Sequence, residues 1–346
     1  MISELKFFSE LNYFLKNNES FVVFKKPSHD KIVCHQGDVT RVKIDDIDNK
    51  GFLFMPFDLN EEGYFLTPKT TTETKFHLRV NNNNSHEIAI DDFSSKKKSY
   101  IKFINETIDK IHSSELEKVV CSSVFNIKLN FESCSEYFKK LIQLNHDAFC
   151  YLFYHPEIGI WVGASPEKLL NLNSNIVTTF ALAATKKEMN QSWSDKEFRE
   201  QKIVEEQIVS DLDRGCTNIQ TGTLQTVKAG NLYHLKSVIK AKTKKTSSDL
   251  IKLLHPTPAV AGTPKNKAIS YIHKKENYNR SFYTGYMGLF EKHSCDIYVN
   301  IRCAKIVDDN LTIYVGGGIT KDSNAFDEWN EIVNKSHTML GVFHSS

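Results

Sequence analysis

Short strand-like runs separated by turn-forming residues recur along most of this chain. Within residues 21–80 the runs are FVVF, KIVCHQ, GFLFMPF, GYFLTP and KFHLRV, with Pro, Asp, Asn or Gly between them. Such runs favour hairpins and antiparallel pairing. Farther along, AFCYLFYHPEIGIWVGAS predicts a hairpin that turns at 156–159. A chain of this kind is constrained to large, mainly antiparallel sheets.

Helical spacing interrupts these runs at intervals. Apolar residues recur three, four and seven apart from about Tyr100, and similar patterns mark the N-terminus, FESCSEYFKKLIQLN, DKEFREQKIVEEQIVSDLDR, NKAISYIHKKE and the C-terminus. We therefore predict the α/β (α+β) class. The polar segment 81–98 predicts a loop and is the one candidate linker. It divides a variable N-terminal part, 1–99, from a core, 100–346, in what we expect to be one continuous domain.

The composition and the N-terminal sequence predict a cytoplasmic protein. A net charge of +2 gives no reason to expect nucleic acid or a membrane as partner, and no apolar run approaches membrane-spanning length. The N-terminus lacks the apolar region of a signal peptide. Seven scattered cysteines without metal-type spacing predict reduced thiols.

Two ionisable residues stand in unusual positions. Lys118 lies in the strand-like run LEKVVCSSVF, which is apolar on both faces. It is either an edge-strand lysine that reaches water or a buried lysine with a lowered pKa that acts as a general base. Glu167 follows a strand in GASPEKLL, and the residues alone favour a helix start there, with Ser165 as N-cap, Pro166 at N1 and Glu167 at N2.

Anion-binding groups are suggested farther along. Arg302 lies in DIYVNIRCAKI, which predicts a buried strand, and a buried arginine needs an anion, whether a structural partner or a substrate carboxylate. The run Gly316, Gly317 and Gly318 ends a strand and could expose backbone amides, although such glycines also mark bulges. His255 opens the proline-rich segment LLHPTPAVAGTP, which could form a pocket wall or simply be structural.

The C-terminal helix carries Glu328, Glu331 and Lys335 on one side. Glu331 and Lys335 are four residues apart, as in an ordinary solvated ion pair. The same side also carries apolar residues, so these charges could instead face a cavity. Glu200, in the charged helix, cannot be separated from its solvated neighbours by pattern alone.

The order of these motifs resembles a known family. ELEKVV, GASPEKLL, FALAATKK, DKEFREQKIV, LLHPTPAVAGTP, NRSFYTGYMG, VNIRCAKI, YVGGGI and DEWNEIVNK follow one another over about residues 100–341. Together they resemble the chorismate-utilising enzymes, related to anthranilate synthase component I, and most closely the isochorismate synthase branch. The resemblance implies one large fold in which two layers of mainly antiparallel sheet are flanked by helices.

The resemblance also implies a Mg²⁺-dependent site for chorismate. Glu200 and Glu331 would be the magnesium ligands, with Glu328 beside them acting through water. The enolpyruvyl carboxylate would be held by Arg302, Lys335 and the amides at 316–318. The remaining pocket positions would be Ala184, Thr185, His255 and Ala259. Relatives of this kind are often monomers.

The implied reaction adds water at ring carbon 2 and expels the hydroxyl at ring carbon 4. Lys118 would activate the water as a neutral amine, and Glu167 would protonate the leaving hydroxyl. Salicylate synthase, which also eliminates pyruvate, and a catalytically silent chorismate-binding homologue are the alternatives. The resemblance leaves menaquinone and siderophore synthesis both open as the destination of the product.

Four positions depart from the family pattern. Ala184 stands where a glycine is usual, so its methyl could crowd the substrate. Gln201 replaces a histidine, Glu197 an aspartate and Ile332 a threonine. None of these departures removes a proposed catalytic group.

Overall fold

The computed structural model describes residues 1–77, 91–129, 131, 133–186, 188–229 and 232–343. Its helices are α1 (Glu4–Lys16), the short 3-10 helix η1 (Ile44–Asp46), α2 (Asp91–His112), α3 (Cys134–Leu144), α4 (Asp195–Asp213), α5 (Ser247–Leu254), α6 (Lys265–Lys275) and α7 (Ala325–Phe343). Every pairing between the described strands is antiparallel.

The strands of the N-terminal half are β1 (Phe21–Lys25), β2 (Lys31–Val42), β3 (Gly51–Met55), β4 (Gly63–Lys75), β5 (Lys118–Lys128), β6 (Phe149–His155), β7 (Gly159–Ser165), β8 (Lys168–Asn173) and β9 (Ile176–Lys186). Those of the C-terminal half are β10 (Cys216–Thr221), β11 (Gln225–Ala229), β12 (Leu232–Thr243), β13 (Gly262–Thr263), β14 (Tyr286–Glu291), β15 (Ser294–Val299), β16 (Cys303–Val307) and β17 (Asn310–Thr320).

Two layers of sheet enclose an aromatic core. In β6, Phe149, Tyr151 and Phe153 join an inner cluster with Trp161, whereas Cys150 and Leu152 face the opposite way into a cluster under helices. Successive side chains of a strand point to opposite faces, so both faces of such strands are buried. This explains why many runs are apolar throughout. The predicted two-layered fold is confirmed.

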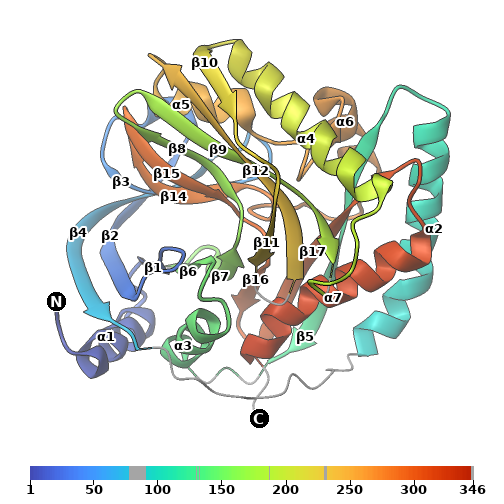
Figure 1. Cartoon of the computed structure of the whole chain (residues 1–346). Helices are drawn as coiled ribbons and strands as arrows, with labels where there is room; N and C mark the ends of the chain where they lie inside the picture. Colours follow the sequence, from blue (N-terminus) through green and yellow to red (C-terminus); the bar gives the residue numbers. More distant parts are fainter. Residues whose placement is uncertain (78–90, 130, 132, 187, 230–231, 344–346) are drawn as a thin grey trace.

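The helices cover the two outer faces (Figure 1). Apolar residues of α1, α2, α3, α6 and α7 share one cluster. Those of α4 and α5 share another, against strands that include β9, β12 and β15. The two helices that carry the candidate metal ligands, α4 and α7, thus belong to different layers and approach each other at their N-terminal ends.

Most local predictions held. The run KFHLRV is an exception, because β4 ends at Lys75 and neither Phe76 nor His77 lies in a strand; two larger failures remain. The hairpin at 156–159 joins β6 to β7 as expected. The predicted loop 81–98 is wrong from Asp91 onward, because α2 begins there; its earlier part and residues 78–80 lie outside the described residues. Phe93 stabilises this early turn by packing edge-on against Phe125 and Trp329.

The second failure concerns Arg302. DIYVNIRCAKI was predicted as one strand, but β15 ends at Val299 and β16 begins at Cys303. Arg302 lies in the break with a φ of 50°, in the left-handed region. Asn300 stabilises the break: its side chain donates to the Phe282 carbonyl and accepts from the Tyr151 hydroxyl. The chain direction therefore changes where Arg302 enters the site.

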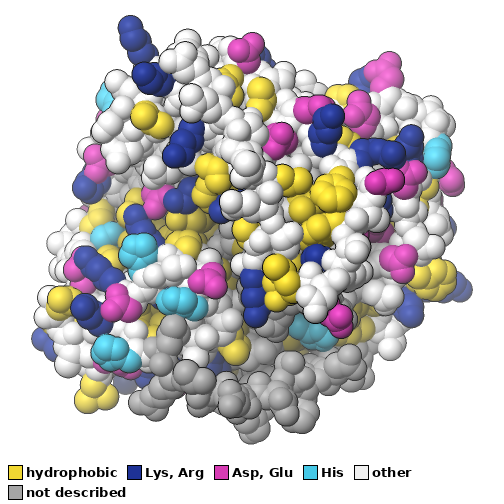
Figure 2. Space-filling view, in the orientation of Figure 1, with side chains coloured by type: hydrophobic (Ala, Val, Ile, Leu, Met, Phe, Trp, Pro, Cys, Tyr) yellow, Lys and Arg dark blue, Asp and Glu magenta, His cyan; other side chains and the backbone are white. Residues whose placement is uncertain are grey.

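The surface and the cysteines give no sign of a special environment. Basic and acidic side chains are intermixed over the face shown in Figure 2, in keeping with the small net charge. All seven cysteines lie in the described part of the chain and are buried free thiols. None of the described helices has the length and hydropathy needed to span a bilayer.

Candidate active site

One pocket collects most of the predicted site residues. Its lining includes Lys118, Glu167, Ala184, Thr185, Glu200, Ala259, Arg302, Gly316, Gly318, Glu331 and Lys335. These residues come from β5, β9, β17, α4, α7 and three connecting segments. His255, Gly317 and Glu328 are not part of the lining. Residues scattered over more than 200 positions of sequence thus converge on one cavity.

Lys118 is buried at the start of β5, with only 1% of its surface exposed. It is flanked by Thr263 of β13 and Thr320 of β17. The alternative of an edge-strand lysine reaching water is therefore wrong. Its ammonium donates to Oε1 of Glu200 at 2.9 Å. Burial opposes ionisation of Glu200, but Lys118, with smaller contributions from Lys335 and Lys196, keeps the pKa of Glu200 below its ordinary value.

Glu167 is the second buried ionisable group. It lies between β7 and β8, and because β8 begins at Lys168 the alternative of a helix start is wrong. Only 4% of its surface is exposed. Burial raises the pKa of Glu167 to about 7, against the opposing effects of Lys118, Thr257 and Lys335. A carboxyl group with this pKa can be protonated near neutral pH, which suits a general acid.

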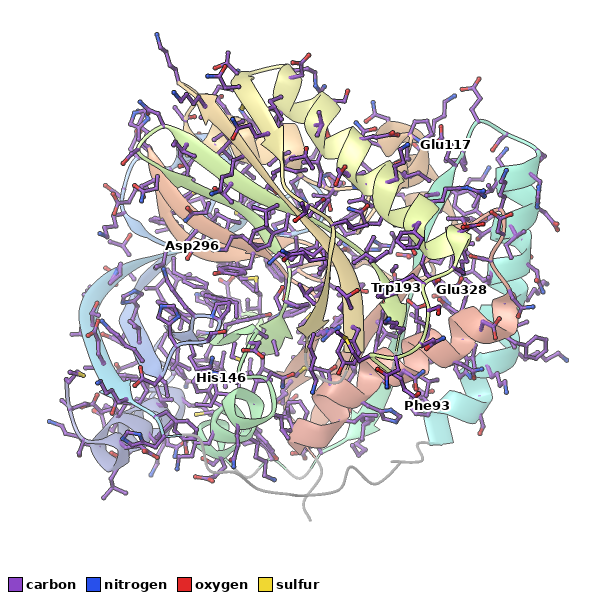
Figure 3. All side chains as sticks on the ribbon, viewed as in Figure 1. Phe93, Glu117, His146, Trp193, Asp296 and Glu328 are labelled. Atoms are coloured by element: carbon purple, nitrogen blue, oxygen red, sulfur yellow. The ribbon has the colours of Figure 1, made fainter. Side chains whose placement is uncertain are left out.

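Helix α7 presents charges to the pocket. Lys335 pairs with Glu331 at 2.7 Å, as the four-residue spacing predicts, and also donates to the Gly316 carbonyl at 3.0 Å. Both side chains line the pocket, so the pair is not merely a solvated helix face. Glu328 is 2% exposed and pairs with Lys196 of α4 at 2.9 Å. Figure 3 shows Glu328 where the beginning of α4 approaches α7.

Each candidate metal ligand is thus paired with a lysine. Burial and the nearby Glu331 carboxylate raise the pKa of Glu328 to about 7, against the effect of Lys196. The repulsion between the buried Glu328 carboxylate and the Glu331 carboxylate would be relieved by a bound cation. All the donors are oxygens, which Mg²⁺ prefers, so the residues fit a magnesium ion. Among the described residues, however, no three His, Cys, Asp or Glu side chains already stand grouped as a metal site.

The glycines of β17 make room for these groups. A Cβ built on Gly318 would lie 2.6 Å from Oε1 of Glu200 and 2.7 Å from Cε of Lys118. Any side chain there would displace the ion pair. β17 pairs with β16 only up to Tyr314, so its later residues have one edge that β16 does not cover. Gly316 and Gly318 line the pocket along this stretch.

His234 of β12 lines the pocket and was missed by the sequence analysis. Its Nδ1 lies 2.7 Å from the Ala184 carbonyl and its Nε2 lies 2.7 Å from Nη2 of Arg302. A carbonyl only accepts, so Nδ1 carries the proton and Nε2 accepts from the guanidinium. Burial, followed by the charge of Arg302, lowers the pKa of His234 well below its ordinary value. Burial also lowers the pKa of Arg302 to about 10.

This neutral imidazole joins two residues with positive φ. Ala184 has φ 60° and Arg302 has φ 50°, both uncommon for residues with a side chain. A glycine, which is usual at position 184 in the family, would adopt this conformation without strain, whereas Ala184 does not. In sequence, His234 stands in NLYHLKSVIK, where alternation places it on the same face as Lys236 and Lys240, so the pattern gave no signal of its burial. The register of β12 against β9 shifts between Tyr233 and Leu235, beside this residue.

Three further positions are clarified by the structure. His255 lies outside the pocket lining: its Nε2 donates to the Phe57 carbonyl at 2.9 Å, and its ring packs against Tyr286. The prediction that His255 lies in the pocket is therefore wrong. Through these contacts, His255 holds the start of the proline-rich segment against Phe57 and Tyr286. Gly317 faces away from the pocket, toward Glu328. Gln201 is buried, and its amide donates to the Ser237 hydroxyl at 3.0 Å.

The comparisons with known proteins agree with this geometry. A family model described as "Chorismate binding enzyme" matches residues 65–344. Isochorismate synthase MenF of Haemophilus influenzae is 25% identical over 318 residues, which cover 86% of this chain and 72% of the relative. The vibriobactin-specific isochorismate synthase of Vibrio cholerae is 24% identical over 321 residues, covering 87% and 81%.

A solved structure shares the fold. MenF, the menaquinone-specific isochorismate synthase from Escherichia coli, superposes with a TM-score of 0.80 at 20% identity, covering 94% of this chain and 89% of that one. The family model spans most of the sequence, including every residue of the pocket lining. The chain belongs to the chorismate binding enzymes.

Proposed function

We propose that this chain is an isochorismate synthase that converts chorismate to isochorismate with Mg²⁺. The observation that carries the proposal is the presence of buried Lys118 and Glu167 in the same pocket, with the pKa of Glu167 raised to about 7. Water addition with loss of a hydroxyl needs a base and an acid. Two relatives of this chain are named isochorismate synthase, which supports the proposal of this reaction.

The substrate carboxylates would be held by cationic groups on two sides of the pocket. Arg302 presents a planar guanidinium whose orientation is set by His234. Lys335 reaches the same cavity from α7. Because the pocket wall is otherwise apolar at Leu182, Ala183 and Val260, the polar groups dictate the orientation of the ring.

Magnesium would be held by Glu200 and Glu331, with Glu328 close by. Bound there, the ion would supply positive charge to the ring carboxylate of chorismate. The glutamates come from α4 and α7, so the loaded site would connect the two helical layers.

The proton transfers fall to residues of the chain. Glu167 would donate a proton to the departing hydroxyl oxygen, and Lys118 would accept one from the attacking water. In this structure Lys118 donates to Glu200. An ammonium cannot accept a proton, so the role as a base requires that Lys118 first release one. With Glu200 engaged as a magnesium ligand, its carboxylate would no longer stabilise the ammonium, which would favour this release. The buried setting of both groups excludes bulk water from the proton transfers.

The test is product analysis. Purified protein is incubated with chorismate, with and without Mg²⁺, and the products are separated by chromatography. We expect isochorismate without pyruvate, lost on chelation and restored by added Mg²⁺. Salicylate with pyruvate would instead indicate a salicylate synthase, and no turnover under any condition would indicate a silent chorismate-binding protein.

We further propose that the enzyme acts as a cytoplasmic monomer. The acid, the base, the cationic groups and the candidate metal ligands proposed for the reaction all belong to this one chain, as a monomeric enzyme requires. Light scattering coupled to size exclusion would measure a mass near 39.7 kDa if this is correct.

A further inference from the structure

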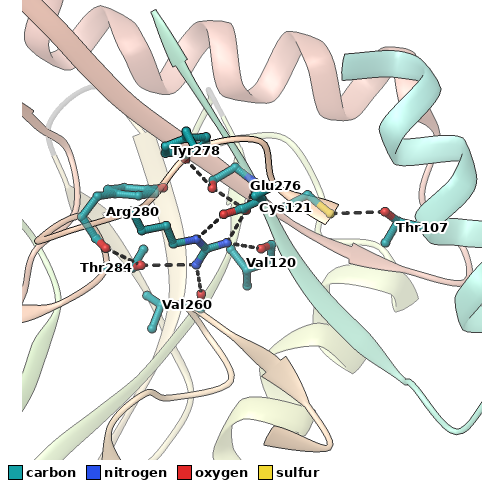
Figure 4. Close-up of polar contacts among 10 residues, drawn as sticks. Thr107, Val120, Cys121, Val260, Glu276, Tyr278, Arg280 and Thr284 are labelled. Atoms are coloured by element: carbon teal, nitrogen blue, oxygen red, sulfur yellow. Dashed lines mark hydrogen bonds and ion pairs between the residues drawn. The ribbon is translucent and has the colours of Figure 1, made fainter. Parts of the chain in front are cut away.

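A buried ion pair lies behind one wall of the pocket. Glu276, the C-cap residue of α6, and Arg280 each have side chains only 2% exposed. The guanidinium donates to the two carboxylate oxygens through Nε at 2.8 Å and Nη2 at 2.6 Å (Figure 4). Burial opposes the charge of Arg280, but Glu276 outweighs it and raises the pKa of Arg280 above its ordinary value. Neither side chain lines the pocket itself.

The remaining donors of Arg280 reach three residues that do line the pocket. Nη2 donates to the Val120 carbonyl at 2.6 Å, and Nη1 donates to the Val260 carbonyl at 2.9 Å and to the Thr284 hydroxyl at 3.3 Å. One guanidinium therefore connects β5, the segment after α5 and the segment before β14.

Arg280 lies where the pairing between β13 and β5 ends. β13 pairs with β5 at Gly262–Val119 and Thr263–Lys118, and the Val120 amide donates to the Ala261 carbonyl. Past this point the guanidinium, rather than the opposite strand, donates to the carbonyls of Val120 and Val260. A buried carbonyl that loses its donor is costly. Only arginine offers donors in several fixed directions within one plane.

Glu276 connects the same pair to β5 from the other side. Its Oε1 accepts from the Ser122 amide at 3.0 Å and from the Ser122 hydroxyl at 2.5 Å. Ser122 also contacts the Tyr278 hydroxyl at 2.6 Å. The segment of β5 that begins with Lys118 is thus held at two successive points, Val120 and Ser122.

We propose that Arg280, held by Glu276, is a positioning residue for the reaction. It keeps the Lys118 end of β5 at a set distance from the wall formed by Ala259 and Val260. This inference rests on the proposed function, because it assumes that Lys118 acts on the substrate. Arg280 does not touch the substrate; it acts through the backbone of the residues that do.

The test compares Arg280→Lys with a matched control, Lys265→Met. Lys265 is also a mostly buried cation that donates to two backbone carbonyls, those of Leu253 and Leu254, and it pairs with buried Asp211. None of these residues lines the pocket. Both variants lose interactions between a buried cation and the backbone, so both are expected to lower the melting temperature.

The steady-state constants are measured for both variants well below their melting temperatures. Because a displacement of about 1 Å near reacting groups can cost ~100-fold in rate, we expect Arg280→Lys to lower kcat by about that factor. The KM for chorismate should change by less than about threefold, since Arg302 and Lys335 remain. Lys265→Met should retain kcat. Equal kcat values in the two variants would overturn the proposal.

A second measurement does not depend on turnover. After correction for each variant's change in global stability, hydrogen exchange of the amides at 118–122 and 259–263 should be faster in Arg280→Lys than in wild type and unaltered in Lys265→Met. Unchanged exchange in both segments would overturn the positioning role, whatever the activity. A wild-type protein inactive on chorismate would instead refute the proposed function alone. If Arg280→Lys does not fold, Ser122→Ala removes the hydroxyl that contacts Glu276 and Tyr278 and should give the same pattern at about tenfold smaller effect.

Discussion

Replacing Glu167 by glutamine separates the catalytic effect of this residue from its effect on stability. Its pKa is raised from the ordinary 4.5 to about 7, chiefly by burial. Since a tenfold change in an equilibrium is about 1.4 kcal/mol, burial disfavours the ionised form by about 3 kcal/mol. At pH 7 about half the molecules hold the proton, whereas an ordinary glutamate would hold it in about one molecule in 300.

The same pKa makes the fold less stable at high pH. Between about pH 4.5 and pH 7 the folded chain keeps a proton on Glu167 that the unfolded chain has released, so stability falls as the pH rises through this range. Glutamine cannot ionise and lacks this loss. Glu167→Gln should therefore gain up to about 3 kcal/mol relative to wild type at pH 8, and much less at pH 4.5.

The assay pairs thermal unfolding at several pH values with isochorismate formation. We expect the melting temperature of the variant to exceed that of wild type by more at pH 8 than at pH 5, while kcat/KM falls by about 10²–10⁴-fold. The kcat/KM of wild type should decline as the pH rises through about 7, because the acid loses its proton. A pH-independent difference in melting temperature would refute the burial argument. A variant with near-normal turnover would refute the role as an acid.

Three further substitutions test neighbouring parts of the site. Lys118→Met should abolish turnover and, by leaving Glu200 without its ammonium partner, cost about 3–5 kcal/mol in denaturant unfolding; adding Glu200→Gln should recover stability but not activity. Ala184→Gly should relieve the positive φ and stabilise the fold by up to about 1 kcal/mol; a loss of stability would show that the alanine is not strained. His234→Phe removes the imidazole acceptor that contacts Nη2 of Arg302, so KM for chorismate should rise about 10–100-fold with a smaller change in kcat, and an unchanged KM would contradict this orientation of the guanidinium.

Much of the fold was predictable from local sequence. The β6–β7 hairpin depends on a turn and flanking apolar residues that are adjacent in the chain, and α7 depends on a 3.6-residue period. The order of short motifs indicated the family, which the family model confirms over residues 65–344. The start of α2 was not predictable, because the polar turn after Asp91 is stabilised by Phe93 packing on residues far away in sequence.

The sequence by itself determined which residue types are available for chemistry. The motif GASPEKLL contains Glu167, and the motif DEWNEIVNK contains Glu331 and Lys335. Only the tertiary structure decided their environment. The Lys118–Glu200 contact joins residues 82 positions apart. The raised pKa of Glu167 exists only once packing has removed water from its carboxyl group. Desolvation and long-range contact belong to the packed chain as a whole, and no local pattern encodes them.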